Sequence, residues 1–159
     1  MALARLFDGL GHAPVQAAWV ALIAALLASL GGDRPAAGVL VMAMLGQWGV
    51  NQLGKTLIDR PRPQLDPQLY TVGASFPSGH AMLSAVTYLT LGVLLARLSP
   101  RRRVKAYVVG VAVALTLLVG CSRVYLGVHW ATDVIAGWML GALWVLVCVL
   151  AARFWSARH

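Results

Sequence analysis

Five long apolar stretches constrain the fold of this chain more than any other feature. They span residues 14–30, 35–58, 79–98, 104–121 and 130–154. A helix needs about 20 mostly apolar residues to cross the hydrocarbon core of a bilayer. Hydrophobic residues make up 60% of the 159 positions and charged residues only 11%, too few charges to cover a water-soluble globule. We therefore predict an all-α integral membrane bundle of about five transmembrane helices, folded as a single domain over residues 1–159.

The N-terminal segment allows two interpretations. The first apolar stretch is short and follows Arg5, as in a secretory signal peptide, but the positive segment is weak and contains Asp8. Residues 1–11 carry apolar side chains at helical spacing, namely Leu3, Leu6, Phe7 and Leu10. That pattern is typical of an amphipathic helix lying on a bilayer surface. We prefer a membrane helix preceded by such an interfacial segment.

The basic residues set the expected orientation. The net charge is +8, and Arg97, Arg101, Arg102, Arg103 and Lys105 crowd the connection between the third and fourth stretches. Basic residues in short connections stay on the cytoplasmic side of a membrane. The N-terminus and the connections 59–78 and 122–129 then face the exterior or, in a bacterium, the periplasm. Because a basic cluster between two spans serves topology, we expect no nucleic-acid partner.

Small residues recur every four positions at Ala17/Ala21/Ala25, Gly110/Ala114 and Gly137/Gly141. In lipid, this spacing lets helix backbones approach closely. It predicts a compact bundle. Whether the Gly137/Gly141 face packs inside the bundle or between copies stays open, and so does the oligomeric state.

A set of polar residues stands at the helix ends on the non-cytoplasmic side, where such groups are costly and usually functional. The set comprises Lys55, Arg62, Pro77-Ser78-Gly79-His80, Ser122-Arg123, His129 and Asp133. Three cations suit a phosphoryl group and the charge that develops on its oxygens. The Ser78-Gly79 segment opens a helix, and free N–H groups at a helix N-terminus also bind anions.

Two histidines and a carboxylate supply reactive groups beside those cations. His129 and Asp133 are four residues apart and share one face of a helix. The carboxylate can accept a proton from one imidazole nitrogen and leave the other free as a nucleophile. His80, from another helix, can act as a general acid.

Each of these residues alone has a simpler explanation. A single His80 can be an interfacial residue with satisfied hydrogen bonds, and Asp133 can be favoured by the positive end of a helix. Asp59 is expected to pair with Lys55 or Arg60 near the lipid headgroups, whereas Asp66 and His12 resemble solvated loop residues. The combination, rather than any single residue, indicates a phosphate site.

The spacing of this set resembles the three-part signature of the type 2 phosphatidic acid phosphatase family. Its parts are Lys55-x6-Arg62-Pro63, then Pro77-Ser78-Gly79-His80, then Ser122-Arg123-x5-His129-x3-Asp133. All three are present in order between residues 55 and 133. The flanking apolar stretches are similar to those of the family's membrane branch. One difference is that bacterial membrane members often have six spans, so we expect the family's first helix to be missing here or reduced to residues 1–11.

The resemblance implies a role for each residue. His129 would attack phosphorus and form a phosphohistidine, Asp133 would orient His129, and His80 would protonate the leaving alkoxide and then activate water. The phosphate oxygens would be held by Lys55, Arg62, Ser78, Gly79 and Arg123. The resemblance implies no metal and no other cofactor, and the sequence offers no carboxylate cluster for magnesium.

The implied activity is hydrolysis of a lipid phosphate at the outer face of a membrane, in a bacterium the cytoplasmic (inner) membrane. Candidate substrates are phosphatidylglycerophosphate, phosphatidic acid, undecaprenyl pyrophosphate and a lipid A phosphate, among which the sequence does not choose. Vanadate-dependent haloperoxidases have a similar site but are larger and soluble. A transporter or a silent lipid-binding scaffold is the non-enzymatic alternative, which the complete set of reactive residues disfavours.

Overall fold

A computed structural model describes residues 2–29, 34–63 and 73–156, and within these ranges the chain forms helices and no strands. The prediction of an all-α fold is therefore confirmed. The elements are α1 (Ala2–Leu10), α2 (Ala13–Ser29), α3 (Arg34–Ile58), α4 (Gly79–Ser84), the π-helical turn η2 (Ala85–Leu89), α5 (Thr90–Arg97), α6 (Arg102–Tyr125) and α7 (Ala131–Ser156).

Each predicted apolar stretch corresponds to a helical rod. In the described part of the chain, three rods are long and apolar enough to cross a membrane: Gly79–Arg97, Arg102–Tyr125 and Ala131–Ala151. The first of these combines α4, η2 and α5. The 17-residue α2 and the 25-residue α3 match the first two stretches, although Leu30 and the turn at 31–33 lie outside the described residues.

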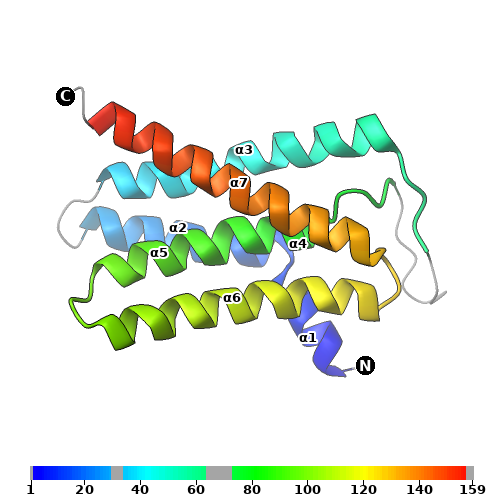
Figure 1. The fold of residues 1–159 in the computed structure, drawn as a ribbon, viewed down its shortest axis with the longest axis horizontal. Helices are drawn as coiled ribbons and strands as arrows, with labels where there is room; N and C mark the ends of the chain where they lie inside the picture. The colour runs from blue at the N-terminus through cyan, green and yellow to red at the C-terminus, as the bar shows by residue number, and fades with distance from the viewer. Residues whose placement is uncertain (1, 30–33, 64–72, 157–159) are drawn as a thin grey trace.

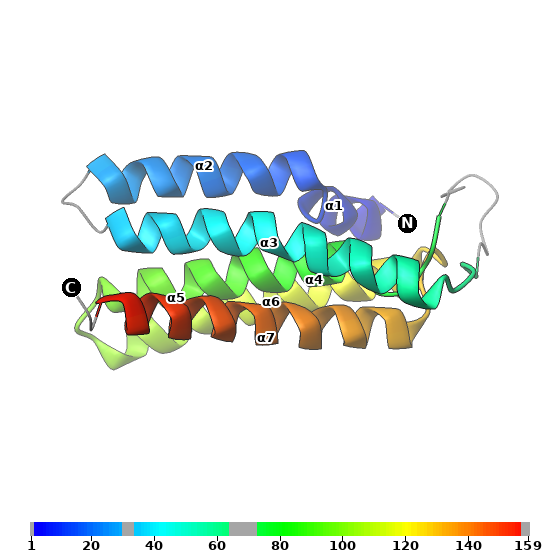
Figure 2. The same cartoon turned by 90° about the horizontal axis from the view of Figure 1, so that it is seen from above.

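The rod formed by α4, η2 and α5 is the centre of the bundle. Figure 1 shows it between α6 and α7, and Figure 2 shows α2 on the outer side of α3. Its small and apolar side chains, such as Ala81, Met82, Ala85 and Val86, are fully buried. The opposite pattern holds on the outer helices, where large apolar side chains are exposed. Such a surface is suited to lipid rather than water.

Close packing of α7 on α4 depends on the small residues of α7. A Cβ atom on Gly137 would lie 2.7 Å from the Ser78 carbonyl oxygen, and one on Gly141 would lie 2.8 Å from the Met82 carbonyl oxygen. The face that these glycines form therefore packs inside the bundle. The predicted close approach of another helix does not occur at Gly110, because no atom lies within 4 Å of a Cβ built there.

The N-terminal segment is a short helix, as the apolar spacing predicts. α1 packs on α6 at the end of the bundle where α6 runs into α7 (Figure 1). Leu3 and Leu6 are exposed, whereas the carbonyl oxygen of Leu10 accepts hydrogen bonds from Tyr88 Oη (3.0 Å) and Gln16 Nε2 (3.0 Å). These two bonds fix the C-terminal end of α1 against the bundle.

Candidate active site

The residues predicted to form a phosphate site converge at one end of the bundle. This end contains the C-termini of α3 and α6 and the N-termini of α4 and α7 (Figure 1). The basic connection between α5 and α6 lies at the other end. Four separate segments therefore place their side chains at this end of the bundle, on one side of the expected membrane.

His129 lies in the short connection between α6 and α7 and is buried, with 4% of its surface exposed. Its Nε2 lies 3.1 Å from Arg62 Nη1. A guanidinium only donates hydrogen bonds, so Nε2 is assigned as the acceptor and the proton is assigned to Nδ1. Burial, and to a lesser extent the charges of Arg62, Arg123 and His80, lowers the pKa of His129 to about 3. The imidazole is consequently neutral near pH 7, as a nucleophile must be.

Asp133 is fully buried in the first turn of α7. Its Oδ2 accepts a hydrogen bond from the backbone N–H of Trp130 (2.9 Å), which is the reciprocal half of a capping box. The distance from Oδ2 to His129 Nδ1 is 3.5 Å, at the outer limit of a hydrogen bond. The helical-face argument for this pair does not apply as stated, because α7 begins at Ala131 and His129 precedes it. The two groups are neighbours through the helix cap instead.

Arg60 is a site residue that the sequence did not identify. Its Nη1 donates to Asp133 Oδ1 (2.9 Å) and Thr132 Oγ1 (2.6 Å), and its guanidinium lies 5.1 Å from the centre of the Trp130 ring. Asp59, the partner expected from sequence, forms no ion pair within the described residues. A buried carboxylate requires a cation, but only the fold shows which one supplies it.

Arg62 links the segment after α3 to the segment before α4. Its Nε donates to Gly73 O (2.9 Å) and its Nη2 to Ala74 O (3.3 Å), while Nη1 also reaches Val128 O (3.2 Å). Burial lowers the pKa of Arg62, and the charge of Asp133 partly opposes this effect. The side chain is thus held beside His129 from three directions.

The Ser78-Gly79-His80 segment opens α4 and is joined directly to α7. The Ser78 N–H donates to the Asp133 carbonyl oxygen (3.0 Å). Ser78 is the N-cap residue of α4, yet its hydroxyl makes no capping hydrogen bond. The charges of Lys55 and Arg62 both act on the His80 imidazole. Gly79 starts the helix next to these groups.

Arg123 lies in the last turn of α6 and is buried, with 6% of its surface exposed. Its Nη1 is bonded to Asp8 Oδ1 of α1, a contact that the sequence did not indicate. Its Nε has no hydrogen-bond partner.

Unsatisfied polar atoms concentrate in this site. The described residues contain seven buried side-chain nitrogen or oxygen atoms without a hydrogen-bond partner. Four of the seven belong to predicted site residues: Ser78 Oγ, His80 Nε2, Arg123 Nε and His129 Nδ1. Buried polar atoms are normally paired. His129 Nδ1 faces Asp133, and the other three atoms are unused where a phosphate would present oxygens, so the arrangement suits an oxyanion.

Comparison with known proteins gives a family and several relatives. The sequence profile of the PAP2 superfamily matches residues 35–156. Phosphatidylglycerophosphatase B of Bacillus subtilis is 38% identical over 111 residues, which are 67% of this chain and 53% of that protein. Undecaprenyl-diphosphatase of Sulfolobus acidocaldarius is 36% identical over 106 residues, 67% of this chain and 46% of the relative. The chain thus spans about half the length of these relatives.

Two solved structures share the fold. The crystal structure of a transmembrane PAP2-type phosphatidylglycerolphosphate phosphatase from Bacillus subtilis superposes with a TM-score of 0.87 at 28% identity, covering 94% of this chain and 75% of that one. Aquifex aeolicus LpxE gives a TM-score of 0.69 at 20% identity, covering 92% and 82% of the two chains. The second likeness concerns the fold alone.

Proposed function

This chain belongs to the PAP2 superfamily, and on that premise we propose that it is a metal-independent phosphatase of membrane lipid phosphates. The observation that carries the proposal is the group of three unpartnered polar atoms Ser78 Oγ, His80 Nε2 and Arg123 Nε, beside the His129 imidazole. Leaving such atoms buried without partners is unfavourable. A bound phosphoryl group would satisfy them, so their grouping supports phosphate as the ligand.

The first chemical step is attack on phosphorus by His129 Nε2, which carries the lone pair. The new N–P bond forms as the bond from phosphorus to the leaving oxygen breaks. His80 gives its proton to that oxygen. The imidazole of His129 becomes positively charged, and the buried carboxylate of Asp133, with Oδ2 3.5 Å from Nδ1, stabilises this charge.

The second step releases phosphate. His80, now neutral, removes a proton from water, and the oxygen of that water attacks phosphorus. The N–P bond breaks and returns the electron pair to His129 Nε2. Two displacements at phosphorus thereby restore both histidines to their starting states, with inorganic phosphate as the second product.

Fixed cations supply the charge stabilisation that a metal provides in other phosphatases. Arg62 donates to His129 Nε2 in the structure, so it must turn toward the phosphate oxygens when substrate enters. Lys55 and Arg123 approach from α3 and α6, and Ser78 and Gly79 contribute the start of α4. Their combined charge suits the dianion of a phosphate monoester or the larger charge of a pyrophosphate.

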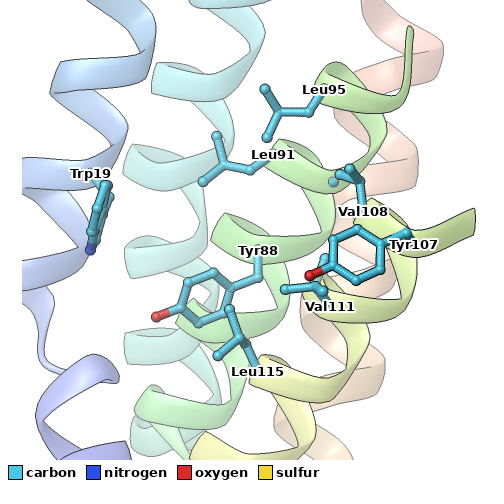
Figure 3. Close-up of a pocket in the computed structure, with 10 residues that line it drawn as sticks. Trp19, Tyr88, Leu91, Leu95, Tyr107, Val108, Val111 and Leu115 are labelled. Atoms are coloured by element: carbon cyan, nitrogen blue, oxygen red, sulfur yellow. The ribbon is translucent and has the colours of Figure 1, made fainter. Parts of the chain in front are cut away.

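An apolar groove of about 340 Å³ supports a lipid as the substrate. Trp19 of α2, Tyr88 and Leu91 of the central rod, and Val111 and Leu115 of α6 lie along it (Figure 3). Tyr88 is eight residues beyond His80, about 12 Å along the helix axis. We assign the groove to a hydrocarbon chain of the substrate, because its lining is apolar and lies farther along the bundle axis from the phosphate end, at the depth of the lipid tails.

Membrane orientation follows from the basic connection between α5 and α6, which lies at the end opposite the site (Figure 1). Basic connections remain cytoplasmic, which supports a position of the phosphate site at the outer face. In a bacterium this corresponds to the periplasmic side of the inner membrane. The substrate would reach the site laterally from the outer leaflet.

The test is phosphate release in detergent from a panel of lipid phosphates: phosphatidylglycerophosphate, phosphatidic acid, undecaprenyl pyrophosphate and a lipid A phosphate. We expect release from at least one of them and loss of release in the His129→Ala variant. Size-exclusion chromatography of that variant shows whether it remains folded. Full turnover by a folded His129→Ala protein would remove His129 from the mechanism, and no release by the unmodified protein from any of them would contradict the proposed function.

A further inference from the structure

The carboxylate of Asp8, on the N-terminal helix α1, lies among the residues of the proposed site. We propose that Asp8 is a positioning residue of the phosphatase: it holds the guanidinium of Arg123 and places a negative charge beside His80. α1 is then a working part of the site and not only an interfacial anchor. This inference rests on the proposed function.

The contact with Arg123 is the first observation. Asp8 Oδ1 accepts a hydrogen bond from Arg123 Nη1, and the two side chains are 19% and 8% exposed. A guanidinium buried to this degree needs a carboxylate partner. Because Asp8 engages Nη1 and Nε remains unpartnered, the pairing leaves Arg123 a donor for a phosphate oxygen. Asp8 therefore fixes the guanidinium and leaves its Nε–H free to donate a hydrogen bond.

The second observation concerns His80. Its Nε2 lies 3.8 Å from Asp8 Oδ1, and within the described residues this is the nearest ion-pair contact of its imidazole. The other charged or titratable groups around His80 are His12, Lys55, Arg62 and His129. Those groups oppose a positive charge on the ring when they are protonated. A carboxylate favours the protonated imidazole, which is the form that gives a proton to the leaving oxygen.

The third observation is that α1 is held firmly enough to position Asp8. The Leu10 carbonyl is bound by Tyr88 and Gln16. A Cβ atom on Gly11 would lie 2.7 Å from both His80 Cδ2 and Val119 Cγ1. The junction between α1 and α2 thus fits closely against the ring of His80, and Asp8 stands one helical turn before this junction.

A metal site is the competing explanation. Asp8, His12 and His80 each offer a ligand atom, and these atoms lie within 4.8 Å of one another. A divalent cation there would meet the positive guanidinium of Arg123, which already occupies Asp8 Oδ1. The charges of Lys55 and Arg62 also act on His80. In these positive surroundings, Asp8 is better suited to pairing with the cationic side chains than to binding a metal ion.

The experiment compares two substrates that differ in their need for a general acid. Dihexanoyl phosphatidic acid has a poor alkoxide leaving group, whereas p-nitrophenyl phosphate has a good one. The value of kcat/KM covers the steps up to cleavage of the ester bond. For Asp8→Asn we expect a loss of about 10- to 100-fold with the lipid, less than the roughly 100- to 10,000-fold contribution of a general acid itself, and a loss under about 3-fold with p-nitrophenyl phosphate. Asp59→Asn, the same change on the same side of the membrane, should alter neither value.

Three results would overturn the inference. Equal losses with both substrates would contradict the role of Asp8 beside His80, and thermal unfolding of the variant shows whether the loss is only one of folding. Unchanged values would show that it has no role, and higher activity would show that it competes with phosphate for Arg123. If the unmodified protein hydrolyses no lipid phosphate at all, the proposed function fails instead, so the two failures are distinguishable.

Discussion

Replacement of Gly137 by alanine tests whether the packing of α7 on α4 sets the geometry of the site. The added Cβ atom would lie 2.7 Å from the Ser78 carbonyl oxygen, whereas ordinary contacts begin near 3.4 Å. The helices must therefore separate by about 0.7 Å, because a backbone oxygen cannot rotate away. The Ser78 N–H donates a hydrogen bond to the Asp133 carbonyl oxygen at 3.0 Å. The displacement therefore shifts the start of α4 and the start of α7 relative to each other, and both carry site residues.

The expected magnitudes follow from this displacement. Overpacking costs about 1–3 kcal/mol, and alanine returns about 1 kcal/mol of helix propensity, so we expect a net destabilisation of about 0–2 kcal/mol. A misplacement approaching 1 Å lowers catalysis by up to about 100-fold. We expect kcat to fall about 10- to 100-fold while the protein still folds.

The assay is steady-state kinetics on a lipid phosphate in detergent, together with thermal unfolding. Gly110→Ala on α6 is the matched control, because no atom lies within 4 Å of its Cβ position, and it should keep full activity. Full activity in Gly137→Ala would refute the claim that this helix contact positions the catalytic groups.

Four further predictions concern the chemistry. Because burial lowers the pKa of His129 to about 3, and protonation removes its lone pair, the acid-side decline of kcat/KM, corrected for substrate ionisation, should lie below about pH 4; an acid-side decline centred near pH 6.5 contradicts this. Arg60→Gln removes a charged hydrogen bond from Asp133; with Arg60 36% exposed, we expect a loss of about 1–2 kcal/mol in thermal unfolding, largely avoided in Arg60→Lys. EDTA should leave phosphate release unchanged, and a loss restored by magnesium would argue against fixed cations. Val111→Trp should impair hydrolysis of long-chain lipids but not of p-nitrophenyl phosphate, whereas Val113→Trp, outside the groove, should impair neither.

The helices follow directly from the hydropathy of the sequence, since each apolar stretch has one stable solution in lipid. Their ends are less predictable. The fourth stretch was expected to end at Cys121, but α6 continues to Tyr125, so Ser122 and Arg123 lie within its last turn. Polar residues do not stop a helix when their side chains find partners, as Ser122 does in the Val119 carbonyl of α6 and Arg123 does in Asp8 of α1.

The site residues were predictable where a local motif carries them, and the structure places them at one end of the bundle. Arg60 and Asp8 were not predictable. Their partners, Asp133 and Arg123, lie 73 and 115 residues away in sequence. Pairings over such separations depend on how the helices pack, and neither residue stands in a spacing that local periodicity can detect.

The most direct test of the account is to locate the phosphorylated residue during turnover. A lipid phosphate labelled with ³²P, mixed with enzyme and quenched in alkali, should leave label on the peptide that contains His129. Recovery of the label on any other residue would contradict the mechanism.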